Sequence, residues 1–261
     1  MSPVYIGSLI GLGVIPSLVW FSFFLRNDSS HPEPKYLLAQ TFLMGIIVSP
    51  VVLLFQIGFV YVGAFFMSTA PEIVQISSFY YIWAAFAEEL LKFGAIWFLV
   101  LRNPAFDEPV DAMMYMIAAG LGFAAIENIL VLFRTIDTGL YQAMSVWALR
   151  FIGSTLLHAL ASAIVGYFLA MSWFFSNHKK KLIIIGLVLA TIFHFTFNII
   201  ISVFAGEPGS SDPRGLIYST MLLMFMAFLV SILFDKLKER SQVINIGLVS
   251  YKNKPINFIN V

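Results

Sequence analysis

The chain has 261 residues, of which 60% are hydrophobic and only 11% are charged. Because a soluble domain carries about 25% charged residues, this composition indicates a protein that lies mainly in a lipid bilayer. The net charge of +1 gives no sign of a nucleic-acid partner, and the lack of cysteine excludes disulfides, zinc–thiolate sites and a cysteine protease.

Seven long apolar segments follow one another along the chain. A helix needs about 20 apolar residues to cross the core of a bilayer, and each segment is long enough. Turn-forming and charged residues separate the segments, which cover residues 3–25, 36–67, 79–101, 110–134, 143–175, 181–204 and 215–235. None shows the alternation of a membrane β-strand. The sequence therefore predicts an all-α fold, a polytopic membrane bundle of about seven transmembrane helices.

The second and fifth segments are longer than a membrane requires. We expect each of them to tilt, to break or to extend into the headgroup region, and we expect Pro50 to interrupt the second. The first segment has neither the basic flank nor the small-residue cleavage site of a signal peptide. It is therefore expected to stay in the protein as a helix.

The orientation is predicted from the basic residues, which are retained on the cytoplasmic side of a membrane. With the N-terminus outside, eleven Lys and Arg residues lie in the cytoplasm, and only Arg134 and Arg214 lie outside. This asymmetry predicts an outer N-terminus and a cytoplasmic C-terminus. Lys92 and Arg150 fall inside or at the edge of predicted spans, so they need a separate explanation.

The third span contains three charged residues that are close in sequence. Glu88 and Lys92 are four residues apart, and Glu89 and Lys92 are three apart, so all three side chains share one part of a helix surface. A charge at the centre of a bilayer costs on the order of 3 kcal/mol. Such residues are candidates for a functional site.

Polar residues of the same kind recur in the next three spans. Glu127 and Asn128 lie in the fourth span, His158 lies in the fifth, and His194 and Asn198 lie one helical turn apart in the sixth. We expect no such group in the first, second and seventh spans. Each residue alone is explained by a structural clasp or an interhelical hydrogen bond. Their convergence on four successive spans favours function.

Water activation is the chemistry that this set supports. A buried glutamate can take a proton from water, imidazoles can orient that water or bind a metal, and amides can donate to an oxyanion. The sequence lacks both the HExxH pattern of a zinc protease and a pair of aspartates in the middle of its spans. Ser154 and Ser162 lie near His158, but neither lies in a nucleophile turn, and helix packing explains both.

In this order, the residues resemble the PrsW family of intramembrane proteases, a branch of the superfamily that includes the CAAX prenyl endopeptidases. The resemblance covers about residues 80–205. It depends on residues in consecutive spans, which are Glu88, Glu89, Lys92, Asp111, Ala112, the run from Gly122 to Asn128, His158, His194 and Asn198.

The resemblance implies an enzyme of the cell membrane that hydrolyses a membrane-anchored protein, and in the best-known members this substrate is an anti-sigma factor. The predicted spans and the basic residues indicate one transmembrane domain over residues 1–240, followed by a cytoplasmic tail over 241–261, and the resemblance places the catalytic core at about 80–205. No nucleic acid is expected as a partner. The oligomeric state stays open.

The roles of the site residues are expected as follows. Glu88 or Glu89 is the general base, Lys92 holds the charge of the pair, and His158 and His194 orient water or a metal. Glu127 is a second acid or ligand, while Asn128 and Asn198 are oxyanion or supporting donors. If a divalent metal such as zinc is present, the expected ligands are Glu89, Glu127, His158 and His194; a metal-free glutamate protease is the alternative.

Three interpretations without proteolysis stay open at this point. The fold could serve a binding or immunity-type membrane protein, or a proton-coupled transporter that uses the same acids as a relay. Transporters of this kind usually contain paired repeats, and none is found in the sequence. A cytochrome with His158 and His194 as axial ligands would leave the acids unexplained.

Overall fold

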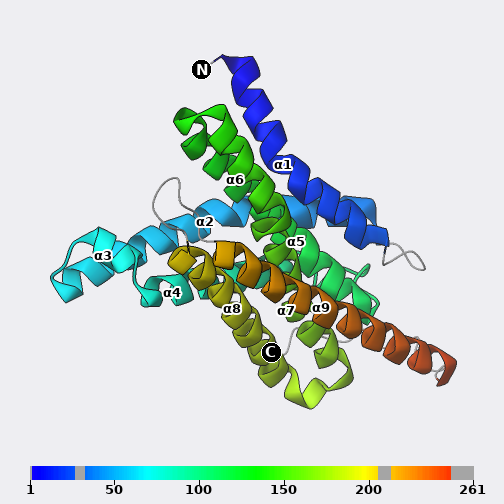
Figure 1. Cartoon of the computed structure of the whole chain (residues 1–261). Coiled ribbons are helices and arrows are strands. Elements are labelled where there is room, and N and C mark those ends of the chain that lie inside the picture. Colours follow the sequence, from blue (N-terminus) through cyan, green and yellow to red (C-terminus); the bar gives the residue numbers. More distant parts are fainter. Residues whose placement is uncertain (1, 27–32, 205–212, 248–261) are drawn as a thin grey trace.

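The computed structural model describes residues 2–26, 33–204 and 213–247, and side chains as far as residue 241. The described residues form helices joined by short turns and loops, without strands. The α-helices are α1 (Pro3–Leu25), α2 (Lys35–Met67), α3 (Pro71–Gln75), α4 (Ser78–Leu99), α5 (Pro109–Thr135), α6 (Leu140–Ile152), α7 (Ser154–Phe174), α8 (Lys179–Phe204) and α9 (Pro213–Gly247), with short 3-10 turns η2 (Ile136–Thr138) and η3 (Ser176–His178) (Figure 1).

The described residues contain six helical stretches that are long and apolar enough to cross a membrane: α1, α2, α5, the pair α6 and α7, α8, and α9. Helix α4 has 22 residues but contains Glu88, Glu89 and Lys92, so its charges distinguish it from these six. The all-α membrane bundle is therefore confirmed. The total of about seven spans and the orientation of the termini stay predictions.

Helix α5 lies at the centre of the bundle, with α1, α2 and α7 against it (Figure 1). Every residue from Pro109 to Ala125 is buried, and Ala and Gly make up much of that stretch. Small residues let helix backbones approach closely in membranes, where packing replaces the hydrophobic effect as the driving force. The Ala and Gly residues of α5 therefore allow the neighbouring helices to cross it closely.

Two glycines mark the closest crossing of α2 and α5. A Cβ atom added at Gly122 would overlap the carbonyl oxygen of Phe42, and one added at Gly45 would overlap that of Ala119. These positions therefore accept no side chain unless one helix moves. The crossing keeps α2 close to the polar residues of the neighbouring helices.

The long segment predicted at residues 143–175 forms two helices, α6 and α7, which meet at Gly153. The backbone of Gly153 has φ −82° and ψ −89°, which is not helical. Helix α6 lies beside α1, and two indoles tie these helices together: Trp147 Nε1 donates to the Leu12 carbonyl oxygen at 2.7 Å, and Trp20 Nε1 donates to that of Phe151 at 2.8 Å. The expected break of the fifth segment is confirmed.

The expected interruption of α2 at Pro50 is wrong, because α2 continues from Lys35 to Met67 with Pro50 inside it. Membrane helices tolerate an interior proline, since neighbouring helices and local adjustments satisfy the freed backbone groups. Helix α9 is also longer than predicted: residues 241–247 of the expected tail continue it. Residues 248–261, the rest of the expected tail, lie outside the described residues.

Gly122→Ala should lower the free energy of unfolding by about 1–3 kcal/mol, because the added methyl group forces α2 and α5 apart. Gly58→Ala in α2 is the matched control, since a Cβ atom there meets nothing within 4 Å. Unfolding in mixed detergent micelles measures both variants. Equal stability of the two would contradict the close crossing.

Candidate active site

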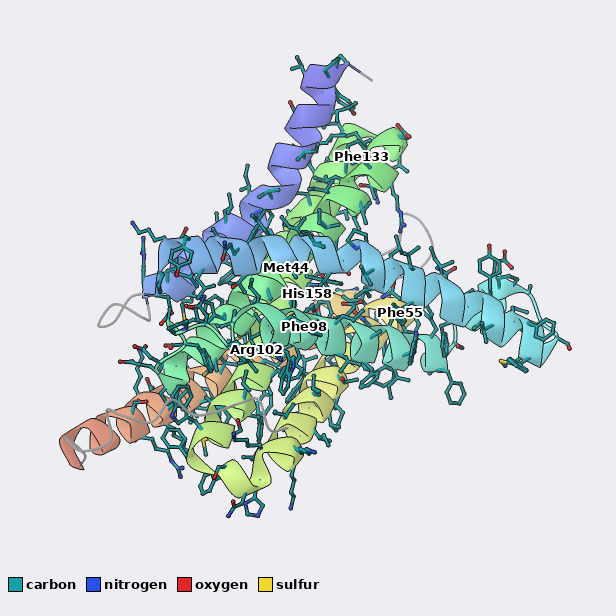
Figure 2. The ribbon with its side chains drawn as sticks, turned by 180° about the vertical axis from the view of Figure 1, so that it is seen from behind. Met44, Phe55, Phe98, Arg102, Phe133 and His158 are labelled. Carbon is teal, nitrogen blue, oxygen red and sulfur yellow. The ribbon has the colours of Figure 1, made fainter. Side chains whose placement is uncertain are left out.

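The polar residues of four helices meet near the centre of the molecule, where His158 lies (Figure 2). Glu88, Glu89 and Lys92 come from α4, and Glu127 and Asn128 come from α5. His158 comes from the first turns of α7 and His194 from α8. Side chains far apart in the sequence therefore form one cluster, as predicted from their convergence on successive spans.

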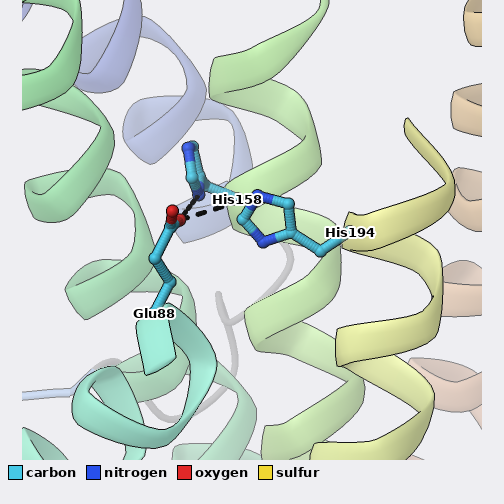
Figure 3. A group of neighbouring side chains, drawn as sticks. All are labelled: Glu88, His158 and His194. Carbon is cyan, nitrogen blue, oxygen red and sulfur yellow. Dashed lines mark ion pairs between the residues drawn. The ribbon is translucent and has the colours of Figure 1, made fainter. Parts of the chain in front are cut away.

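Glu88, His158 and His194 form a group of possible metal ligands within this cluster (Figure 3). One possible ligand atom from each residue lies within 4.8 Å of the other two. Glu88 Oε2 is 3.6 Å from His194 Nε2 and 3.9 Å from His158 Nδ1. This oxygen is buried, and it has no hydrogen-bond partner in the part of the chain that the structure describes.

Glu89 and Lys92 lie next to this group, and their contacts determine which nitrogen of His194 carries the hydrogen. Lys92 Nζ donates to Glu89 Oε1 at 2.8 Å, and His194 Nδ1 donates to the same oxygen at 2.9 Å. A neutral His194 that donates from Nδ1 has its lone pair on Nε2, the nitrogen nearer Glu88. Glu89 thereby selects the tautomer of His194, as carboxylates behind metal-binding histidines commonly do.

Both ring nitrogens of His158 contact charged residues that do not belong to the group of Glu88, His158 and His194. Lys92 Nζ lies 2.9 Å from His158 Nδ1, and His158 Nε2 lies 2.8 Å from Glu127 Oε2. Since an ammonium group only donates and a carboxylate only accepts, Nδ1 carries the lone pair and Nε2 carries the hydrogen. Lys92 also lies over the ring of Phe123, 4.4 Å from its centroid.

Arg150 links α6 to the cluster, which explains a charge that the sequence left unassigned. Its Nη2 atom donates to Glu127 Oε2 at 3.1 Å, and its Nε atom donates to Asn128 Oδ1 at 2.8 Å. The side chains of Arg150 and Glu127 are 21% and 26% exposed, whereas those of Glu88, Glu89, Lys92 and both histidines are at most 6% exposed. Glu127 and Arg150 therefore form the open edge of the cluster.

The predicted amide donors have different surroundings. Asn128 Nδ2 donates to Thr155 Oγ1 at 2.9 Å, so this buried amide is engaged on both sides. Asn198 lies one turn beyond His194 on α8 and is half-buried. Unlike Asn128, Asn198 makes no side-chain hydrogen bond with the residues that the structure describes.

Asp111, which is part of the resemblance, lies apart from this cluster at the start of α5. Its Oδ2 atom accepts hydrogen bonds from the backbone N–H groups of Asp107 at 3.0 Å and Glu108 at 2.7 Å. The bond from Glu108 is one half of a capping box between Glu108 and Asp111, which satisfies donors at a helix N-terminus. A structural role explains this residue.

Gln56 is a member of the cluster that the sequence analysis missed. The interpretation assigned no polar group to the second span, and this is wrong: Gln56 Nε2 of α2 donates to Glu88 Oε1 at 3.0 Å. A signal was present, because an amide in the middle of an apolar span is costly to bury without a partner. The sequence alone does not give that partner.

The group of Glu88, His158 and His194 has a composition that suits a divalent cation. Two imidazoles and a carboxylate are the ligands of many catalytic zinc sites, which leave a position open for water. The geometry favours Glu88 as the carboxylate ligand, because Glu89 and Glu127 contact nitrogens of the histidines from behind. The Lys92 ammonium lies against His158 Nδ1, where it would compete with a cation for that lone pair.

Known proteins are similar to this chain over most of its length. The model of a family described as PrsW family intramembrane metalloprotease matches residues 33–232, a wider range than 80–205. Protease PrsW of Oceanobacillus iheyensis is 27% identical over 243 residues, covering 90% of this chain and 97% of that protein. Protease PrsW of Bacillus subtilis is 28% identical over 205 residues, covering 75% and 83% of the two chains. No solved structure matches the chain.

The contact between Arg150 and Glu127 should stabilise the fold measurably. A double-mutant cycle of Arg150→Met and Glu127→Gln is expected to give a coupling energy of about 1–2 kcal/mol, since the groups make a charge-assisted hydrogen bond in a partly buried site. Unfolding free energies in detergent measure the cycle. Arg134→Met, at an exposed position on α5, is the control that should show no coupling to Glu127→Gln. Additive effects at Arg150 would contradict the contact.

Proposed function

The chain belongs to the PrsW family of intramembrane metalloproteases, and on this premise we propose that it hydrolyses a peptide bond of a membrane-anchored protein with water activated at Glu88. An intramembrane protease acts on a substrate in the bilayer, so a membrane protein is the general class of partner. An anti-sigma factor is the specific candidate that we propose within this class.

The unpartnered oxygen of Glu88 is the observation that carries this proposal. Glu88 Oε2 lies between two imidazoles whose other nitrogens are held by Glu89 and Glu127. With neutral histidines, the cluster contains three carboxylates, those of Glu88, Glu89 and Glu127, and two cations, those of Lys92 and Arg150. One negative charge is therefore uncompensated. A buried charge of this kind is costly unless it binds a proton or a cation.

The proposed reaction uses Glu88 as the general base. Its carboxylate takes a proton from water, the resulting hydroxide adds to the carbonyl carbon of the substrate, and the protonated Glu88 then gives its proton to the departing amine nitrogen. Asn198 is proposed as a donor to the developing oxyanion. Asn128 is proposed as a supporting residue that holds α5 to Arg150 and Thr155.

Glu89 and Lys92 are proposed to stabilise the general base rather than to react. Glu89 Oε1 already accepts from Lys92 and His194, so its negative charge is well compensated, although its second oxygen has no described partner. The Lys92 ammonium lies 3.9 Å from Glu88 Oε2, close enough to stabilise its carboxylate form.

If the enzyme uses a divalent metal, Glu88, His158 and His194 would hold it, and Glu88 would then be a ligand in place of its role as general base. The metal would supply Lewis-acid stabilisation of the oxyanion and a more acidic bound water. Glu89 and Glu127 then act as the carboxylates that orient the two histidines. The metal-free form of the proposal gives the cationic role to Lys92.

Glu88→Gln should reduce cleavage of a single-span model substrate by about 10²–10⁴-fold, because the amide cannot accept a proton from water. Glu72→Gln on α3 is the matched control, since Glu72 is exposed and away from the cluster. Purified protein in detergent, with the substrate fragments resolved by mass spectrometry, provides the measurement. Full activity of Glu88→Gln would contradict the assignment of the base. Absence of cleavage by the wild type over a range of substrates would favour a non-enzymatic role.

The two forms of the proposal differ in metal content. If a metal is used, elemental analysis should give about one divalent ion per chain in the wild type, and the His158→Ala, His194→Ala double variant should lose the metal and the activity together. His178→Ala in η3 is the exposed control and should keep both. Active wild-type protein without stoichiometric metal would support the glutamate protease and exclude the metal-dependent form.

A further inference from the structure

We propose that Gln56 of α2 is a positioning residue that selects which oxygen of Glu88 faces the two histidines. This inference rests on the proposed function, because it assigns a task to the same carboxylate. Gln56 itself needs no contact with the substrate for this task. Its effect is transmitted through one hydrogen bond to Glu88.

The geometry makes the two oxygens of Glu88 unequal. Gln56 Nε2 donates to Oε1 at 3.0 Å, while Oε2 lies 3.6 Å from His194 Nε2 and has no hydrogen-bond partner among the described residues. The terminal torsion of a glutamate is broad, so an unrestrained carboxylate turns easily about its last bond. The amide of Gln56 restrains that rotation. It keeps Oε2, the oxygen without a partner, directed into the group of histidines.

The position of Gln56 on α2 supports a specific task. The neighbouring residues on the same side of the helix, Val52 and Val60, are buried and apolar, and Ala64 continues this side one turn later. An amide placed between them costs free energy unless it is hydrogen-bonded. Gln56 meets that requirement through Glu88.

The competing explanation is that the hydrogen bond of Gln56 only holds α2 to α4. The two helices have other contacts that hold them together. The ring of Phe59 on α2 stacks on Trp83 of α4, with centroids 5.2 Å apart and planes 14° from parallel. Val60 and Ala64 of α2 form a small buried cluster with Val74 of α3, and Tyr80 of α4 packs against this cluster. Loss of one amide is therefore expected to leave the helix pair assembled.

The neutral side chain of Gln56 also suits the charge of the site. The cluster already carries one uncompensated negative charge, so a donor that brings no charge of its own restrains Glu88 without neutralising it. A lysine in this place would compensate the carboxylate, and a glutamate would repel it. An amide restrains the base and leaves its charge available.

The experiment compares Gln56→Met and Gln56→Asn with the control Gln40→Met. Methionine keeps the length of the side chain without its donor, and asparagine keeps the amide but is one methylene too short to reach. Gln40 lies on an exposed face of the same helix. We expect both Gln56 variants to lower kcat by about 10–100-fold, the range found for residues that orient catalytic groups. KM should change less than about twofold, and the unfolding temperature should equal that of Gln40→Met.

A spectroscopic measurement tests the inference without relying on activity. The infrared difference between each protein and its Glu88→Gln counterpart isolates the carboxyl bands of Glu88. These bands should shift in Gln56→Met and Gln56→Asn and stay unchanged in Gln40→Met. If the wild type cleaves no substrate, the proposed function fails, while the infrared result still decides on the contact.

Several outcomes would overturn the positioning role. Unchanged kcat together with unchanged Glu88 bands would show that the hydrogen bond has no effect. A rise in KM alone would indicate that Gln56 binds substrate. If Gln56→Met fails to fold, Gln56→Asn decides, because it retains the polarity of the helix face. A fall in the stability of Gln56→Asn that accounts for its loss of activity would favour a purely structural role for Gln56.

Discussion

The ammonium group of Lys92 is the interaction on which the architecture depends. A cation in the interior of a membrane protein needs partners from the protein itself, because lipid provides none. Glu89 accepts from it at 2.8 Å and His158 at 2.9 Å, so α4 and α7 must lie together. Glu89 in turn accepts from His194 at 2.9 Å, which adds α8. The helices that carry these polar residues therefore surround one centre, while α1 and α9 contribute no side chain to it in the part of the chain that the structure describes and keep exposed apolar faces.

Close packing around α5 makes this arrangement possible. The stretch from Pro109 to Ala125 is fully buried and rich in small residues, so α2 and α7 approach it without bulky side chains between them. Gly120 lies against Ser162 and the backbone of His158, and Gly122 lies against the backbone of Phe42. Gly120 brings the backbone that carries His158 close to α5, and Gly122 does the same for the backbone of α2. The geometry of the polar cluster is thus set by residues that have no polar side chain.

Much of this structure could be predicted from the sequence, because the solvent imposes a simple rule. Long apolar segments must be helices in a bilayer, and charges inside them must meet one another. The rule gave the helical bundle and the convergence of Glu88, Glu89, Lys92, His158 and His194. It could not give the position of Gln56 or the role of Arg150, since their partners lie on other helices and depend on how those helices rotate. Pro50 was misread because a proline that ends a helix in water is tolerated in a membrane.

In the proposed mechanism the adjacent acids of α4 take different roles because their side chains point about 100° apart around the helix axis. Glu89 faces Lys92 and His194 and is held by both, whereas Glu88 faces the gap between the histidines and is held by Gln56 on one oxygen alone. A carboxylate whose charge is compensated by Lys92 and His194 suits the task of orienting an imidazole, and a carboxylate whose oxygen lies between two histidines suits proton transfer. In this proposal the pair Glu88–Glu89 combines a supporting acid with a reactive one in consecutive positions, and the distinction arises from helix geometry rather than from residue type.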